Sequence, residues 1–169
     1  MKRKSYMLDT NVCAFWLRDK YGVKDRVNAV GMENCYISEV TVAELKFGKV
    51  YGRLKGGPKY KGQRLEQFFD DIKILRIEPY FDIYAEEKAR LELAGRPSHD
   101  DFDLLIGCTA IAEDMIMVTE NVKDFQNIQG IQIENWSGRK GIFFPGFFVY
   151  GLEGLEGLTT QPLLDSETP

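Results

Sequence analysis

The side chains best suited to chemistry in this sequence are four carboxylates that stand where apolar runs give way to amphipathic ones. They belong to Asp9, Glu44, Asp103 and Asp124. If those runs are parallel strands and helices, the carboxyl ends of the strands meet at one edge of a sheet, where ligands bind. Like charges gathered there repel one another unless a cation neutralises them, and all-oxygen ligands select Mg²⁺ or Mn²⁺ over zinc or copper. We therefore expect one or two divalent cations at this edge.

Each of these acids also has a structural alternative. Asp9 could cap the helix that follows it. The helix around residue 103 could be capped by Asp100, Asp101 or Asp103 itself. Asp124, taken alone, is an ordinary surface acid. No single acid indicates a cation site by itself. Only if all four carboxylates lie together at one edge of the sheet is a cation site favoured over a set of helix caps.

Glu44 has two interpretations that depend on where its helix begins. Thr41 and Glu44 have the spacing of a capping box, in which Thr41 caps the helix and Glu44 reaches back. If the helix starts nearer Ser38, Glu44 lies a turn and a half inside it and can point across the sheet edge. Polar neighbours of the acids are expected to orient the carboxylates through hydrogen bonds. These neighbours are Thr10, Ser38, Thr119 and Asn121.

Other catalytic chemistries lack the residues they need. The sequence has one histidine, His99, no G-x-S-x-G motif and no Walker loop, so mechanisms with two imidazoles are excluded and nucleophilic triads are unsupported. The three cysteines are odd in number and far apart, which argues against a disulfide framework or a zinc site and favours the reducing cytoplasm. A phosphatase using Asp9 as nucleophile is disfavoured, because such enzymes carry a second Asp where Asn11 stands.

Short apolar runs alternate with longer amphipathic ones, which predicts β-α-β crossovers, a mainly parallel sheet of about five strands and helices on both faces. The expected strands lie at residues 5–8, 35–37, 74–77, 116–118 and 131–133. The expected helices lie at residues 11–20, 42–51, about 65–72, 79–94 and 102–115.

Charge is spread unevenly over the 169 residues. The net charge of −4 by itself argues against a nucleic-acid partner. The segment 45–64, however, holds seven basic and no acidic residues. The remaining residues of the chain therefore carry a net charge of −11. The basic residues are Lys46, Lys49, Arg53, Lys55, Lys59, Lys61 and Arg64. Tyr51 and Tyr60 lie among them. This segment is either a solvated helix end and loop or a phosphate-binding edge with aromatic stacking partners.

Several segments in combination resemble the PIN-domain ribonucleases, and among these the VapC-type toxins of bacterial toxin–antitoxin pairs. The segments are residues 7–11, 37–45, 103–110, 118–125 and the closing 130–136. Together they span residues 5–136 in order. The chain departs mildly from the family at Gly107 and Cys108, where an aliphatic or alanine-rich stretch is usual, and more strongly after Trp136.

The resemblance implies a PIN-like, three-layer α/β/α domain over residues 1–136 that cuts RNA with Mg²⁺. The family's first three acidic positions fall on Asp9, Glu44 and Asp103, and the fourth falls on Asp124 or on the Asn121 site. A homodimer and an antitoxin protein that blocks the acidic pocket are also implied.

The working hypothesis is metal-assisted attack of water on phosphorus, which leaves a 5′-phosphate, while the basic segment 45–64 holds the RNA backbone. The alternative is a PIN-like RNA-binding or protein-interaction module without turnover.

Residues 137–169 differ in composition from the rest of the chain. They contain six of the sixteen glycines and three of the six prolines, together with an apolar run at 142–150 that is too short to span a membrane. We expect a tail without a fold of its own, whose phenylalanines pack on the domain or on a partner, and no association with a membrane.

Overall fold

Five short strands form one parallel sheet in the computed structural model, which describes residues 4–56, 62–98 and 100–138. The strands are β1 (Tyr6–Leu8), β2 (Cys35–Ser38), β3 (Lys73–Leu75), β4 (Ile116–Val118) and β5 (Gln132–Glu134). Their spatial order is β3-β2-β1-β4-β5, and every pairing is parallel. The expected α/β class and the sheet of about five strands are confirmed. The third strand, expected at 74–77, ends earlier than the sequence suggested.

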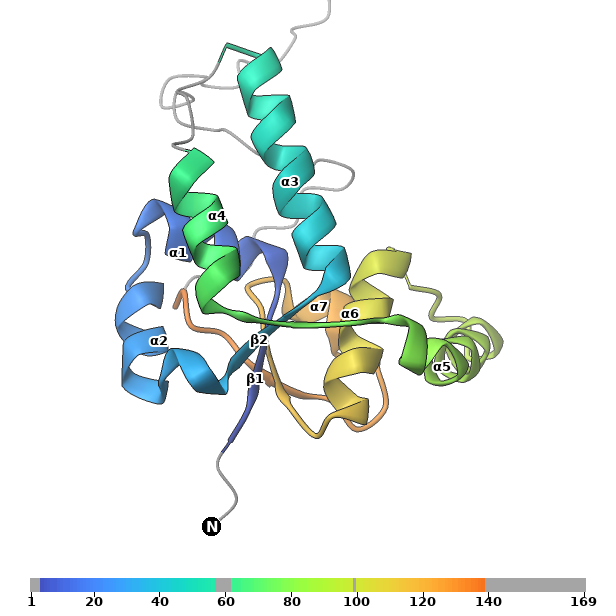
Figure 1. Ribbon diagram of the computed structural model, residues 1–169. Helices are drawn as coiled ribbons and strands as arrows, with labels where there is room; N and C mark the ends of the chain where they lie inside the picture. The colour runs from blue at the N-terminus through green and yellow to red at the C-terminus, as the bar shows by residue number, and fades with distance from the viewer. Residues whose placement is uncertain (1–3, 57–61, 99, 139–169) are drawn as a thin grey trace, which may run out of the picture.

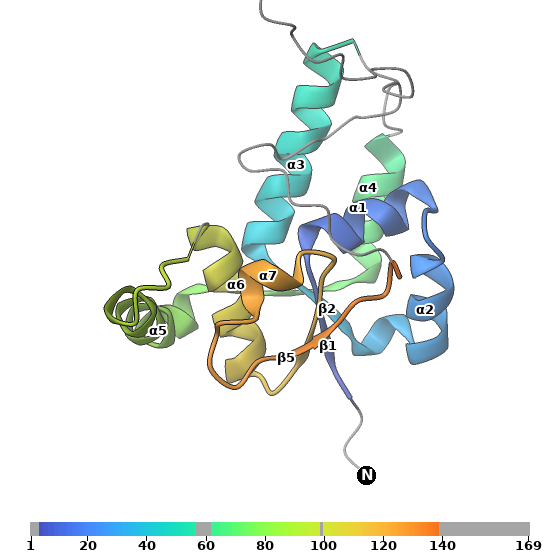
Figure 2. The same ribbon diagram turned by 180° about the vertical axis from the view of Figure 1, so that it is seen from behind.

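Helices connect the strands and cover both faces of the sheet (Figures 1 and 2). They are α1 (Thr10–Arg18), α2 (Val23–Val30), α3 (Glu39–Leu54), α4 (Gly62–Asp71), α5 (Phe81–Leu93), α6 (Asp101–Ala112) and α7 (Val122–Phe125). Short 3-10 turns at Met32–Asn34 and Glu78–Tyr80 precede β2 and α5. The structure is therefore the three-layer α/β/α arrangement that the sequence predicts.

The alternation of side chains along β1 divides the core in two. Tyr6 and Leu8 point into a cluster with α1, α2 and α4, whereas Met7 points into a second cluster with α5, α6 and α7. Trp136 closes the first cluster, with its ring centroid 5.1 Å from that of Tyr6. Burial on both faces explains why β1 and β4 are uniformly apolar rather than alternating.

The sequence did not predict α2 or α7, and α3 is longer than expected. In α2 only Val23 and Val27 are buried, which is too weak an apolar pattern to stand out, and α7 is a single turn. The predicted bounds 42–51 for α3 are wrong at both ends. The helix starts at Glu39, because Ser38 caps it, and it continues to Leu54. The helix expected from Pro79 begins as a 3-10 turn and becomes α-helical at Phe81.

Gly107 allows α6 and α7 to approach each other closely. A Cβ atom at this position would lie 2.3 Å from Cδ1 of Ile128 and 3.3 Å from Cδ1 of Phe125. At this departure from the family's usual residues, the missing side chain leaves room for the ends of the Ile128 and Phe125 side chains. This contact brings the segment that carries Asp124 toward the start of α6.

Several expectations lie outside the described residues. These concern His99, Lys59, Tyr60, Lys61 and the tail beyond residue 138. The division of the chain at residue 136 therefore stays a prediction. Within the ranges that the structure describes, none of the helices has the length and hydropathy that a membrane crossing requires.

Candidate metal centre

Asp9 stands at the carboxyl end of the central strand and is held by three hydrogen bonds. Its Oδ1 accepts from the backbone N–H of Thr10 at 2.7 Å, and its Oδ2 accepts from Asn11 Nδ2 at 2.6 Å and from Thr119 Oγ1 at 2.7 Å. Its own N–H donates to the carbonyl of Val118 at 2.9 Å, which fixes the backbone to β4. Asp9 is thus the cap of α1, as one alternative proposed, and also a buried carboxylate at the sheet edge.

Glu44 lies inside α3, so the capping-box alternative is wrong. Ser38 is the cap and accepts from the N–H of Thr41 at 3.2 Å, which places Glu44 a turn and a half into the helix. Glu44 is buried, and its Oε2 accepts a hydrogen bond from Thr10 Oγ1. Because Thr10 is bonded to both acids, it links Glu44 to Asp9 across the ends of β1 and β2.

Asp103 lies in the first turn of α6 and is 8% exposed. No residue in the described part of the chain donates a hydrogen bond to its carboxylate. Asp100, not Asp103, is the cap of α6, and accepts from the N–H of Phe102 at 2.7 Å. Its oxygens are not themselves fully buried, since among the described residues Trp16 Nε1 is the buried side-chain polar atom that lacks a partner. The carboxylate is therefore left to water or to a ligand.

Asp124 lies in α7, where its N–H donates to the carbonyl of Asn121 at 3.0 Å. It is half-buried, and its negative charge is among those that raise the pKa of both Asp9 and Asp103. Asn121 is exposed, and its N–H donates to Thr119 Oγ1 at 2.9 Å. Of the two positions considered for the fourth acid, the Asp124 charge lies close to the other acids.

The structure therefore brings the four predicted acids together, and we call them the carboxylate cluster. Burial is the largest cause that raises the pKa of Asp9 to about 6, of Glu44 to about 7 and of Asp103 to about 9. The neighbouring charges that act on Asp103 are all negative and come from Asp9, Asp100, Asp124 and Glu44. The neighbouring charges that raise the pKa of Asp9, Glu44 and Asp103 are those of other acids, and a divalent cation would offset them.

The four side chains offer ligand atoms of the kind that such a cation prefers, but their oxygens do not converge on one position in the described structure. All the candidate ligand atoms are oxygens, which suits Mg²⁺ or Mn²⁺. As the side chains stand, no three His, Cys, Asp or Glu groups in the described ranges converge tightly enough to hold an ion.

Of the four polar neighbours expected to orient the acids, Thr10 and Thr119 donate to carboxylates directly. Asn121 acts one step away, through Thr119, whereas the hydroxyl of Ser38 serves as a helix cap. Asn11 was missed as a positioning residue. It is two positions after Asp9, bonds Asp9 through Nδ2, and accepts from the N–H of Glu120 through Oδ1 at 3.3 Å.

The described part of the basic segment lies mainly along α3, which projects beyond the sheet beside α4 (Figure 1). Lys49 is paired with Glu66 at 2.8 Å, whereas the Lys55 ammonium lies 4.7 Å from the centre of the Tyr51 ring. Four of the residues predicted to contact RNA are exposed: Lys46, Arg53, Lys55 and Arg64. Glu44 is on the same helix, but Lys46 lies over the Phe69 ring of α4 and Arg53 is nine positions further on, about 14 Å along the helix axis.

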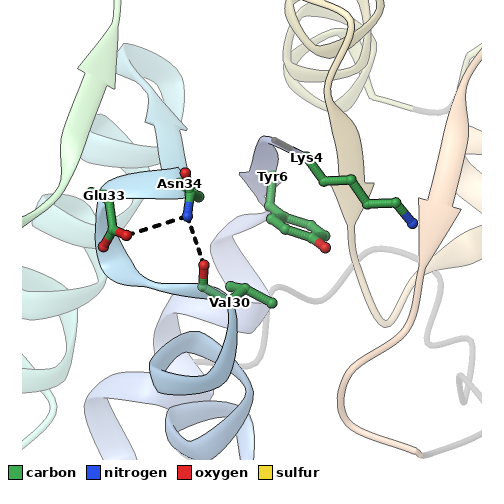
Figure 3. Close-up of a pocket in the computed structure, with 5 residues that line it drawn as sticks. All are labelled: Lys4, Tyr6, Val30, Glu33 and Asn34. Carbon is green, nitrogen blue, oxygen red and sulfur yellow. Dashed lines mark hydrogen bonds between the residues drawn. The ribbon is translucent and has the colours of Figure 1, made fainter. Parts of the chain in front are cut away.

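A separate hollow lies at the opposite edge of the sheet, near the start of β1 (Figure 3). It is lined by Lys4, Tyr6, Val30, Glu33 and Asn34. Asn34 Nδ2 donates to the carbonyl of Val30 at 2.7 Å and to Glu33 Oε1 at 3.4 Å. The hollow includes a single carboxylate, Glu33, and that carboxylate is bonded to Asn34, so the carboxylate cluster remains the candidate site.

A family model and individual proteins similar in sequence point to the same family. The model of the family described as "PIN domain" matches residues 6–131. The chain is 31% identical over 134 residues to "tRNA(fMet)-specific endonuclease VapC" of Shigella flexneri, with 78% of this chain and 98% of that protein covered. It is 33% identical over 137 residues to "Ribonuclease VapC2" of Rickettsia felis, with 78% and 97% covered.

Solved structures agree with the sequence matches. VapBC2 from Rickettsia felis bound to a DNA fragment from their promoter superposes with a TM-score of 0.65 at 31% identity, covering 78% of this chain and 98% of the other. FitAcB from Neisseria gonorrhoeae gives a TM-score of 0.68 at 27% identity, with 79% and 99% covered.

Proposed function

The chain belongs to the PIN-domain family and, within it, to the VapC ribonuclease toxins of toxin–antitoxin systems, and from this premise we propose that its carboxylate cluster binds Mg²⁺ to hydrolyse RNA. The proposed ligands are Asp9, Glu44, Asp103 and Asp124. Nucleases of this family are typically metal-dependent. The observation that carries the proposal is Asp103, which is buried, has no hydrogen-bond donor among the described residues, and is surrounded by negative charge.

Each residue at this edge has a defined task in the proposed reaction. Asn11 and Thr119 hold the carboxylate of Asp9 in one orientation, and Thr10 does the same for Glu44. When bound, Mg²⁺ supplies positive charge to the scissile phosphate and acidity to a water molecule. In its absence the raised pKa values mean that the cluster retains protons, which cation binding would displace. Mn²⁺ suits the same ligands.

The RNA backbone is proposed to lie along the basic surface of α3. A body with net negative charge repels RNA, so a local positive surface is needed to hold it beside the acids. Arg53 and Lys55 supply exposed positive charge there, and Tyr51 offers a ring for stacking. Lys59 and Lys61 belong to the same proposal from their place in the sequence.

The proposed protein partners are a cognate antitoxin and a second copy of this chain. Structures similar to this chain include toxin–antitoxin complexes, some of them bound to DNA.

The three cysteines are buried and unpaired, which supports a role in the reducing cytoplasm. The Shigella flexneri relative is named for tRNA(fMet), which makes that RNA the first substrate to test.

The test is to incubate the purified chain with total RNA and with tRNA(fMet), with Mg²⁺ or EDTA, and to map the ends of the products. We expect Mg²⁺-dependent cleavage that leaves 5′-phosphates and is lost in Asp9→Asn. The matched control is Asp25→Asn, which changes an exposed acid of α2 and should cleave as the unaltered chain does. Products with 2′,3′-cyclic phosphates would contradict the proposal, and RNA binding without cleavage would favour a module without turnover.

A further inference from the structure

Three side chains follow Glu44 at helical spacing along α3. Phe47 comes three positions after Glu44, and Tyr51 and Lys55 follow at intervals of four, so the side chains form a row along one side of the helix. With a rise of about 1.5 Å per residue, Phe47 lies about 4.5 Å and Tyr51 about 10 Å beyond Glu44 along the helix axis. The row therefore begins at an acid of the carboxylate cluster and leads away from it.

The two aromatic rings of this row are stacked on each other. The ring centroids of Phe47 and Tyr51 lie 5.6 Å apart, and the ring planes are inclined by 24°. Lys55 Nζ lies 4.7 Å from the centroid of the Tyr51 ring, so Tyr51 is held between a ring and a cation. Phe47, in contrast, is 58% exposed. An exposed ring that a second ring supports offers a surface on which a planar group can stack.

The part of α3 that carries this row projects beyond the sheet (Figure 1). The last buried residue of α3 is Gly48, six residues before the helix ends at Leu54. Val50 and Leu54 lie on the same side as Phe47 by helical spacing, and both are exposed. A helix face of this kind, with apolar and aromatic side chains in solvent, marks an interaction site.

Charge indicates which ligand suits this face. The segment 45–64 holds seven basic and no acidic residues, and Arg53 and Lys55 are exposed near the rings. A second copy of this chain would bring like charges together, whereas RNA brings phosphates of opposite charge. Proteins hold single-stranded nucleic acid by this combination of positive charge and aromatic rings. Bases inside a duplex are already stacked, so only unpaired nucleotides can offer a base to such a ring.

We propose that Phe47 stacks on an unpaired base of the RNA substrate and so positions the neighbouring phosphate at the carboxylate cluster. Tyr51 supports the Phe47 ring from behind, and Lys55 supplies positive charge to the backbone further along the row. The inference rests on the proposed function and adds a substrate class to it, namely RNA that is unpaired where it meets α3.

The test compares a short single-stranded RNA with the same RNA carrying one abasic site, which is moved along the strand. Binding to the full-length chain is measured in EDTA, and cleavage at low substrate concentration is measured in Mg²⁺. For the unaltered chain, one abasic position should weaken binding and cleavage about ten-fold, because base–aromatic stacking is lost there. Phe47→Leu should lose about as much with the intact RNA and nothing further with that abasic RNA.

Two further readouts separate stacking from a structural or electrostatic role. The salt slope of binding should be the same in Phe47→Leu as in the unaltered chain, because no phosphate contact is lost. Phe47→Trp, which keeps an aromatic ring, should bind the intact RNA at least as tightly as the unaltered chain. The matched control is Phe81→Leu, which removes an exposed ring from α5 and should leave RNA binding and cleavage unchanged.

The ways in which the proposal can fail are distinguishable. If Phe47→Leu weakens the intact and the abasic RNA alike, the residue has a structural role, and if it weakens neither, the exposed face of α3 serves a protein partner. Either result would overturn the stacking and leave the proposed function standing, provided that the unaltered chain cleaves RNA with Mg²⁺. Absence of both RNA binding and cleavage in the unaltered chain would overturn both.

Discussion

Two buried carboxylates on neighbouring helices are treated in opposite ways by this fold. Glu87 of α5 is 7% exposed and Asp103 of α6 is 8% exposed. Glu87 accepts from Arg90 at 2.6 and 2.8 Å and from the N–H of Gln129 at 2.7 Å, and the pKa of its carboxyl is lowered, first by the bond to Arg90. Asp103 has no donor in the described ranges, and its pKa is raised to about 9, first by burial.

The difference shows that the fold can satisfy a buried acid when that acid is structural. Arg90 also donates to the carbonyl of Asn127 at 2.6 Å, so Glu87 and Arg90 together fasten α5 to the segment that leads into β5. Asp103 lacks any such support among the described residues, although a helix start offers free N–H groups nearby. Its charge is therefore available to a ligand, and changes at the two positions should have opposite consequences.

The largest expected effect is on catalysis at Asp103. Replacing Asp103 by Asn removes a proposed metal ligand, and several kcal/mol of transition-state stabilisation correspond to a loss of about 1,000-fold in the rate of RNA cleavage. The same change should raise the melting temperature of the metal-free protein at neutral pH, because the folded protein no longer has to keep a buried carboxyl protonated that ionises freely when unfolded. Cleavage rates and thermal denaturation in EDTA measure the two effects. Retained activity, or a protein that is less stable without metal, would break the contrast.

The opposite result is expected at Glu87. Replacing Glu87 by Gln leaves Arg90 and Gln129 with weaker partners and should lower the free energy of unfolding by about 2 kcal/mol, measured by urea denaturation. Cleavage by the folded protein should be unchanged. Exposed Glu86, on the same helix, provides a matched control as Glu86→Gln, which should leave stability within about 0.5 kcal/mol. Equal stabilities of the two variants would show that the Glu87 contacts are without consequence.

The two acids should also give opposite responses to pH. A carboxyl with a raised pKa holds its proton more tightly when folded, so the Asp103 contribution in metal-free protein falls as pH rises from about 4 toward about 9. The lowered pKa of Glu87 gives stability that is present above its unfolded pKa and lost as pH falls through the folded value. Melting temperatures in EDTA across this range should decline less steeply with pH in Asp103→Asn. Parallel curves for this variant and the unaltered chain would contradict the Asp103 contribution.

The smallest expected effect is on RNA binding by the basic surface of α3. There Lys49, which is paired with Glu66, can be compared with Arg53 and Lys55. Replacing Arg53 and Lys55 by Ala should weaken RNA binding and reduce its salt slope by about 1 for each phosphate that is no longer neutralised. Lys49→Ala should change the slope less, because Lys49 is already paired with Glu66. An unchanged salt slope in the double variant would exclude this surface as the RNA site.

The sequence was sufficient for the sheet, because short apolar runs bounded by polar residues are local patterns. The role of the four acids as ligands stays a prediction that rests on the family resemblance and on their places at the strand ends. The sequence left Glu44 open between a capping box and a helix interior, since the choice depends on whether Ser38 or Thr41 accepts the first N–H group. It missed α2, whose buried side is only Val23 and Val27. It also missed Asn11 as a support for Asp9, although the two are two positions apart.

The contacts that the sequence could not reveal are those between distant segments. The bond from Thr119 to Asp9 joins residues 110 positions apart. The bond from the N–H of Gln129 to Glu87 depends on how α5 packs beside the loop before β5. The pairing of Asp101 with Lys88 likewise joins two different helices, α6 and α5. Such pairings follow from tertiary structure, which spacing along the chain does not encode.

The most direct test of the contrast between the two buried acids is isothermal titration of Mn²⁺ into the metal-free chain, Asp103→Asn and Glu87→Gln. If the uncompensated charge of Asp103 serves a cation, the unaltered chain and Glu87→Gln bind Mn²⁺ alike and Asp103→Asn gives no binding heat. Equal binding by Asp103→Asn and the unaltered chain would contradict the metal centre.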